Sequence, residues 1–357
     1  MKNDKTRIYS LDAIRFIAAI FVMLYHYTFS GYLLNKMSLL NFPSISYVSR
    51  YGFLGVQLFF MISGFVILMT AQNKNIITFI TSRMVRLYPA FWVSVTLTAL
   101  VTVFMGGGRY HIDLIQYLFN LTMISDVFHV NYIDGVYWTL LVEIKFYLCV
   151  WLLIVTKLIH RNTKLLAVFG LWSFLSLLNN YVELPKIISF FLFLEYAPYF
   201  IAGAIFYLGY KDGFTMYKIA IILITYIAAC MYIDKQLIFL SQLLHSDFNQ
   251  PTALFIILLF YFSLLFISIK KIEGNNLLKI MGGVTYPLYL IHENIGFMIG
   301  NIFSNHINKY ILLVSIIFLM LSVSYYIYNV LEKEIARRLT RFFNSLISKI
   351  QPLITLT

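Results

Sequence analysis

The sequence predicts an all-α membrane protein, a polytopic bundle of about ten transmembrane helices with both termini in the cytoplasm. The composition, the length of the apolar runs and the distribution of Lys and Arg lead to this fold class. Hydrophobic residues make up 61% of the chain and charged residues 12%, whereas soluble domains are roughly 45–50% apolar and about 25% charged. The chain is therefore expected to lie in a membrane.

The apolar runs set the number of helices. A helix needs about 20 predominantly apolar residues to cross the hydrocarbon core. Ten such runs follow one another, mostly with short connections, so we expect one membrane domain over residues 1–330. Their ranges are 11–30, 53–71, 89–105, 137–156, 165–181, 187–208, 217–233, 252–269, 283–303 and 310–330.

The positive charges set the orientation. With a cytoplasmic N-terminus, 19 of the 27 Lys and Arg fall on the inner side, six fall on the outer side, and Arg15 and Lys145 lie within the membrane. This asymmetry follows the positive-inside rule, so we expect a multi-pass protein of the cell (inner) membrane. The net charge of +12 is spread over short loops, which favours membrane lipids as partners and argues against nucleic acid.

The C-terminal tail, 331–357, is expected to form a second region. It mixes basic residues such as Arg337, Arg338 and Arg341 with Phe342 and Phe343. This pattern is typical of an amphipathic helix lying on the inner leaflet.

The first apolar run contains residues that are costly in a membrane helix, namely Asp12, Arg15 and His26. An ionisable residue near the centre costs roughly 2.5–3.5 kcal/mol on insertion scales. Arg15 and His26 are eleven residues apart, so they share one face, and they lie roughly 16 Å apart along the axis. We expect Arg15 near the inner leaflet and His26 in the outer half. In a purely structural alternative, Arg15 reaches the headgroups and His26 bonds a neighbouring carbonyl.

Other ionisable residues are expected at the depth of His26. The layer contains two histidines and three carboxylates: His26, His292, Glu143, Glu195 and Glu293. Glu143 shares one helix face with Thr139 and Tyr147 by its four-residue spacing. A histidine oriented by a carboxylate is suited to act as general base on a hydroxyl, and Glu143 is the leading candidate to orient His26. Alternatively, the carboxylates neutralise Arg15, Lys145 or the histidines.

A pair of arginines is expected on the cytoplasmic side. Arg83 and Arg86 precede the third run and share one face if their segment is helical. Two guanidinium groups suit phosphate oxygens well, and Arg15 could contribute to the same site. Anchoring to inner-leaflet lipids is the alternative explanation.

The remaining polar clusters predict no metal cofactor. Cys149 and Cys230 lie in apolar runs without CxxC spacing. The outer loop lacks metal-ligand spacing such as HExxH. We interpret its His and Asp residues as solvated loop residues that could contact a polar substrate: His111, Asp113, Asp126, His129 and Asp134.

Five segments together resemble the motifs of the integral membrane acyltransferase family 3, in the order typical of that family. They are LDAIR with the later histidine, GVQLFFMISGF, RMVRLYP, WTLLVE with FY, and YPLYLIH, at 11–15 with His26, 55–65, 83–89, 138–143 with 146–147, and 286–292. Gln57 and Thr285 depart from the family pattern, where Asp and Ser are common. No hydrolase-like domain follows the last predicted helix, so we expect a stand-alone transferase.

The resemblance implies an acyl-CoA-dependent O-acyltransferase with acetyl-CoA as donor. The acceptor would be a hydroxyl of a cell-surface polysaccharide or its lipid-linked glycan precursor. We expect His26 as general base, Glu143 as its orienting group and His292 as a second polar group. Arg15, Arg83 and Arg86 would bind the donor phosphates. Direct transfer and an acyl-histidine intermediate are both compatible with this site.

Two other classes of function remain open at this level. A transporter or flippase for a glycan or small solute also places ionisable residues at mid-membrane, although no internal repeat is evident. A non-catalytic subunit of a polysaccharide-export assembly is the third possibility.

Overall fold

The computed structural model describes residues 7–34, 37–270 and 273–354, and every regular element in these ranges is a helix. Lys2, Lys5, Lys36 and Lys271 of the charge count lie outside them. The longer helices are α1 (Tyr9–Tyr25), α4 (Gly55–Ala71), α5 (Ile76–Met105), α7 (Trp138–Val155), α8 (Asn162–Leu178), α10 (Ala197–Asp212), α11 (Met216–Leu244), α12 (Gln250–Ile269), α13 (Asn276–Phe303), α14 (Lys309–Tyr326) and α15 (Lys333–Ile354). The shorter elements are η2 (His26–Ser30), α2 (Gly31–Leu33), α3 (Pro43–Ser49), η3 (Arg50–Leu54), α6 (Leu114–Asn120), η4 (Ser125–Phe128), η5 (Gly135–Tyr137), η6 (Leu158–His160), α9 (Lys186–Leu192) and η7 (Ile327–Glu332).

The prediction of an all-helical membrane bundle is confirmed. Each of the ten predicted ranges overlaps a helix. Within the described residues, eight helical segments are long and apolar enough to cross a membrane. Of the remaining two ranges, one corresponds to α8, which is shorter at 17 residues. The other corresponds to the 28-residue α13, which carries buried polar residues.

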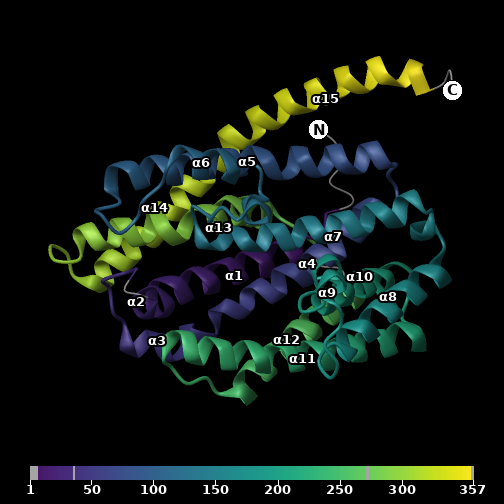
Figure 1. Ribbon diagram of the computed structural model, residues 1–357, viewed down its shortest axis with the longest axis horizontal. Coiled ribbons are helices and arrows are strands. Elements are labelled where there is room, and N and C mark those ends of the chain that lie inside the picture. Colours follow the sequence, from purple (N-terminus) through teal and green to yellow (C-terminus); the bar gives the residue numbers. More distant parts are fainter. Residues whose placement is uncertain (1–6, 35–36, 271–272, 355–357) are drawn as a thin grey trace.

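Helix α1 occupies the centre of the bundle. It packs against α13 on one side and α4 on the other (Figure 1). Helix α5 covers α13 from the opposite side, and α10 packs against α4. Because α1 and α13 are neighbours along much of their length, polar residues on their facing sides come together inside the protein.

Two glycines allow α4 and α10 to approach closely. A Cβ atom at Gly64 would overlap the carbonyl oxygen of Phe200, and one at Gly203 would overlap that of Met61. Small residues at a helix contact are a common way to bring membrane helices together, because close backbones gain van der Waals contacts. This tight contact fixes α4, which forms one wall of the site.

Some predicted boundaries are wrong. Helix α5 begins at Ile76 rather than at residue 89, because the Asn75 side chain caps it by accepting from Thr78 N at 2.9 Å. Pro89 then lies inside the helix. The predicted run 187–208 is instead two helices, α9 and α10, and Phe193 between them has a left-handed backbone with φ 35°.

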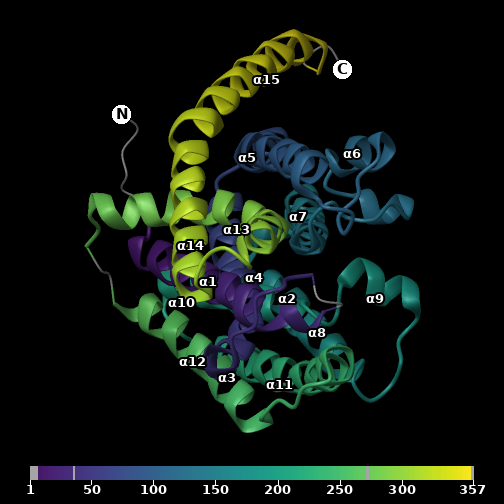
Figure 2. The same cartoon turned by 90° about the vertical axis from the view of Figure 1, so that its left-hand side faces the viewer.

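The C-terminal helix α15 extends away from the bundle (Figures 1 and 2). Its Glu334 side chain pairs with Arg337 and Arg338 at 2.8 and 3.1 Å. Residues 355–357 of the predicted tail lie outside the described ranges. The location of this helix on the inner leaflet stays a prediction.

Candidate active site

His26 lies where α1 changes from an α-helix to a π-helix. The π turn η2 spans His26–Ser30, and such turns occur frequently at functional sites. The His26 side chain is 16% exposed, and its Nδ1 lies 3.0 Å from Oε1 of Glu293 on α13. A carboxylate at Nδ1 favours the tautomer with its proton there, which leaves the lone pair of Nε2 available as a base.

His292 lies directly beside His26, with ring centroids 5.2 Å apart. Its Nδ1 is 2.9 Å from the carbonyl oxygen of Tyr289 and 3.2 Å from that of Leu288. A carbonyl oxygen can only accept, so Nδ1 of His292 carries the proton. Its Nε2 is buried and bonds to none of the described residues. The Tyr27 hydroxyl donates to the His292 carbonyl oxygen at 2.5 Å, which joins η2 to α13.

Asp134 approaches the same centre from the loop that precedes η5 and α7. Its side chain is fully buried and accepts from Asn294 N at 3.1 Å and Val136 N at 3.3 Å. Burial raises the pKa of the Asp134 carboxyl well above its usual range, and the charge of the neighbouring Glu293 raises it further. The next residue, Gly135, leaves room for Glu293, because a Cβ there would lie 2.7 Å from Glu293 Oε2. Asp134 and Gly135 thus both lie next to the Glu293 carboxylate.

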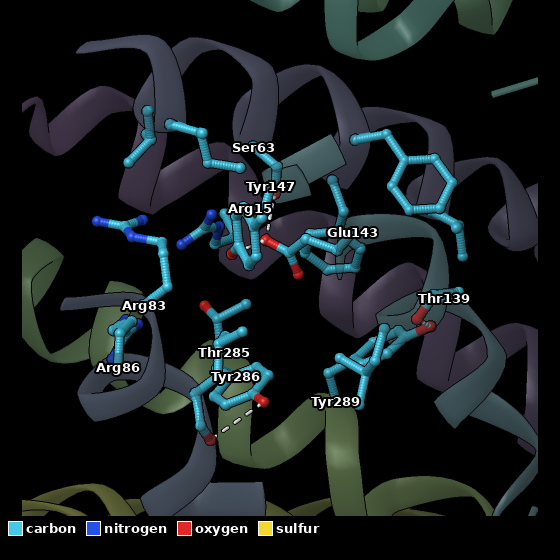
Figure 3. Close-up of a pocket in the computed structure, with 17 residues that line it drawn as sticks. Arg15, Ser63, Arg83, Arg86, Thr139, Glu143, Tyr147, Thr285, Tyr286 and Tyr289 are labelled. Carbon is cyan, nitrogen blue, oxygen red and sulfur yellow. Dashed lines mark hydrogen bonds between the residues drawn. The ribbon is translucent and has the colours of Figure 1, made fainter. Parts of the chain in front are cut away.

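The arginines surround a separate cavity. It encloses about 780 Å³ of space, partly open to solvent, between α1, α4, α5, α7 and α13. Arg15, Arg83 and Arg86 lie toward one end, and Thr139 and Tyr289 lie toward the other (Figure 3). Arg83 and Arg86 both lie on helix α5, and both side chains line this cavity. Their three-residue spacing predicts this shared face for a helical segment.

The three guanidinium groups are only partly neutralised. Arg86 Nη1 lies 2.7 Å from Glu332 Oε1. Arg83 Nε is buried and has no hydrogen-bond partner in the described part of the chain. Arg15 likewise forms no hydrogen bond or ion pair with any residue of the described ranges. This end of the cavity is therefore cationic, with donors available for an anion.

Glu143 lies in the cavity, and the predicted pairing of Glu143 with His26 is wrong. Glu143 Oε1 accepts from Tyr147 Oη at 2.6 Å and from Ser63 Oγ at 3.2 Å. The carboxylate in contact with His26 is that of Glu293. Both glutamates were expected at this depth, but the packing of α13 against α1 brings Glu293 to the imidazole.

A chain of contacts joins the cavity to the histidines. Tyr289 lines the cavity and its hydroxyl is 3.0 Å from Thr139 Oγ1. The Tyr289 ring lies 5.8 Å from the His292 ring, which in turn contacts His26. His26 does not itself line the cavity. Tyr289 and His292 thus connect the end of the cavity opposite the arginines with the imidazole of His26.

Two further expectations are corrected. Glu195 does not belong to the polar layer, because it lies exposed in the break between α9 and α10. Asp134 is not a solvated loop residue but is fully buried. An Asp-Gly pair directly before a membrane helix is a helix-capping signal, and it was the sequence feature that could have placed Asp134 at the helix entrance.

Comparison with known proteins identifies the family. The family model of acyltransferase 3, described as an acyltransferase domain, matches residues 8–329. The peptidoglycan O-acetyltransferase OatA of Listeria monocytogenes serovar 1/2a is 30% identical over 179 residues. That alignment covers 44% of this chain and 26% of the relative. No solved structure matches this chain. Because the family match extends over most of the chain and includes every motif of the site, this multi-pass membrane protein belongs to the acyltransferase 3 family.

Proposed function

We propose that this protein transfers an acetyl group from cytoplasmic acetyl-CoA to a hydroxyl of a cell-surface polysaccharide or its lipid-linked precursor. The observation that carries the proposal is the contact of His26 with Glu293, 3.0 Å apart, next to a cavity whose far end is cationic. The family membership supports acyl transfer, and the similarity to a peptidoglycan O-acetyltransferase supports a glycan acceptor. The protein would act in the cell (inner) membrane.

The cationic end of the cavity fits a phosphate-bearing donor. Coenzyme A carries several phosphate oxygens, and Arg15 and Arg83 have N–H groups without partners among the described residues. Guanidinium groups bind phosphate through paired hydrogen bonds, which are stronger than those between neutral groups. Arg15, Arg83 and Arg86 would therefore hold the donor, and the thioester would lie toward Tyr289 and the histidines.

His26 would serve as the general base. Its Nε2 takes the proton of the acceptor hydroxyl while the hydroxyl oxygen forms a bond to the acyl carbonyl carbon. The carbon–sulfur bond then breaks, and His26 returns the proton to the departing thiolate. Glu293 stabilises the transient imidazolium through Nδ1, as a carboxylate does in a Ser-His-Asp triad.

His292 and Glu143 have different proposed roles. Nε2 of His292 has no partner among the described residues, and the His292 ring lies beside that of His26. His292 would accept a hydrogen bond from a second hydroxyl of the acceptor and so hold the reacting hydroxyl at His26. Glu143, bonded to Tyr147 and Ser63, would position the cavity wall rather than act on the imidazole.

The test is a transfer assay with purified protein in vesicles, radiolabelled acetyl-CoA and the surface glycan of the host. We expect label on the glycan with the wild type and a loss of about 10²- to 10⁴-fold with His26→Ala, in line with the effect of removing a general base. The matched control is His306→Ala, since His306 is exposed in the connection after α13. Wild-type transfer by His26→Ala would exclude His26 as the base.

The same assay separates the alternatives. Movement of glycan across the vesicle without label would indicate a transporter or flippase. Neither movement nor label would indicate a non-catalytic subunit of an export assembly. Label retained on the protein when the glycan is omitted would indicate an acyl-histidine intermediate instead of direct transfer.

A further inference from the structure

A second hollow lies on the other side of α1, away from the proposed catalytic groups. It contains about 1610 Å³ of space, including the part open to the surroundings. Its walls are α1 and α12, and its floor is formed by η3 and the start of α4. Ile17, Phe21 and Leu259 on the walls are 49%, 47% and 47% exposed. Because α1 and α12 are membrane-crossing segments, this groove opens toward lipid hydrocarbon.

The groove has a polar rim at one end. Arg50 is held there by two hydrogen bonds, from Nε to Ser46 O at 3.3 Å and from Nη1 to Asp247 O at 2.8 Å. Its guanidinium lies 5.4 Å from the ring of Phe29 and 5.6 Å from that of Tyr47. These contacts fix the guanidinium in place but leave Nη2 without a partner among the residues described.

An acidic group lies on the same rim. Asp247 contributes its backbone oxygen to Arg50, but its carboxylate pairs with no residue of the described chain. The rim therefore presents one unpaired cationic nitrogen and one unpaired carboxylate. A purely anionic headgroup would meet repulsion from Asp247, whereas a headgroup with both charges complements the two residues.

We propose that this groove binds a phospholipid whose zwitterionic headgroup joins a phosphate to a primary ammonium, as in phosphatidylethanolamine. Arg50 would donate to the phosphate, Asp247 would accept from the ammonium, and an acyl chain would lie along Phe21 and Leu259. A trimethylammonium headgroup cannot donate hydrogen bonds to a carboxylate, so phosphatidylcholine would fit less well.

The site adjoins the segment that carries His26. Phe29, which stacks beneath the Arg50 guanidinium, belongs to the π turn η2 that begins at His26. Thr28 and Ser49 are hydrogen-bonded at 2.6 Å, which joins the same turn to α3. A bound headgroup would thus restrain the π turn from the side opposite to α13.

The test measures lipid binding by native mass spectrometry of the full chain in detergent. The probes are phosphatidylethanolamine, phosphatidylglycerol and phosphatidylcholine with identical acyl chains. We expect phosphatidylethanolamine to bind about tenfold more tightly than the other two, the effect expected of one charge-assisted hydrogen bond. Neither acetyl-CoA nor glycan is present, so the result is independent of the proposed transferase activity.

Four variants locate the site. Arg50→Gln should weaken phosphatidylethanolamine binding about tenfold, and Asp247→Asn should remove its advantage over phosphatidylcholine. Leu259→Trp should exclude the acyl chain and so lower binding of all three lipids. The control Val314→Trp places the same side chain on another lipid-facing helix, at a residue that is 66% exposed, and should change nothing.

Two results would overturn the proposal. Equal binding of the three lipids by the wild type would mean that Arg50 only anchors the protein to the bulk membrane surface. Unchanged headgroup preference in both Arg50→Gln and Asp247→Asn would place the bound lipid elsewhere. If Arg50→Gln does not fold, Asp247→Asn and Leu259→Trp still decide the question.

Discussion

The two ends of the proposed site differ in how their charges are arranged. Around His26, the polar groups are buried and most are paired: Glu293 contacts Nδ1, and Asp134 accepts two backbone N–H groups. Nε2 of His292 and Oε2 of Glu293 lack a partner there among the described residues. Around Arg83, cations outnumber acids, and N–H groups remain without partners within the described ranges. Paired groups cost little reorganisation during a reaction, whereas unpaired cations gain most when an anion arrives. The histidine end is suited to chemistry and the arginine end to binding.

The largest expected effect comes from changing Glu293, the carboxylate that contacts His26. Glu293→Gln keeps the size of the side chain but removes the charge next to Nδ1 of His26. We expect kcat to fall about 10²- to 10⁴-fold with little change in the KM for the donor. Steady-state kinetics with acetyl-CoA as the varied substrate checks this prediction.

Glu143→Gln is the matched comparison for Glu293→Gln. Glu143 bonds to Tyr147 and Ser63 rather than to the imidazole, so we expect kcat to fall by less than about tenfold. If Glu143→Gln abolished transfer while Glu293→Gln remained active, the original pairing of Glu143 with His26 would be restored.

A second test concerns the arginine end. Replacing both Arg83 and Arg86 by Gln removes two donors for phosphate, and each charge-assisted hydrogen bond contributes about 1.5–3 kcal/mol. We expect the KM for the donor to rise at least about a hundredfold, with a smaller change in kcat. Equilibrium binding of acetyl-CoA to the double variant provides the direct measurement.

Arg161→Gln is the control for the double arginine variant. Arg161 is exposed in the turn before α8 and does not line the cavity. Unchanged donor affinity in the Arg83/Arg86 double variant would assign these residues to lipid anchoring.

The smallest expected effect concerns Glu332, which pairs with Arg86 at the arginine end of the site. Glu332 neutralises Arg86 at 2.7 Å and would compete with a donor phosphate for the same guanidinium. Glu332→Gln should therefore lower the KM for the donor about two- to fivefold, since a partly exposed ion pair contributes up to about 1 kcal/mol. The same kinetic assay measures the change.

Glu334→Gln controls for the loss of an acidic side chain. Glu334 pairs with Arg337 and Arg338 on the exposed helix α15, away from the cavity, so its donor KM should stay at the wild-type value. A raised KM in Glu332→Gln would show that Glu332 assists donor binding instead of competing with it.

The sequence by itself determined the helical membrane bundle and the elements that carry the site. Apolar runs of membrane-crossing length identify helices because each span must satisfy its own backbone hydrogen bonds. The eleven-residue spacing of Arg15 and His26 and the three-residue spacing of Arg83 and Arg86 place side chains on helix faces through the fixed helical repeat. Arg15, Arg83 and Arg86 accordingly line one cavity.

Only the tertiary structure decided which groups meet across helices. Depth along a helix follows from the rise per residue, so Glu143 and Glu293 could both be placed near the level of His26. Which of them contacts the imidazole depends on how each helix is rotated and on which helix packs against α1. Because α13 packs there, Glu293 reaches His26. Asp134 joins them because the loop before α7 folds inward, which no helical periodicity specifies.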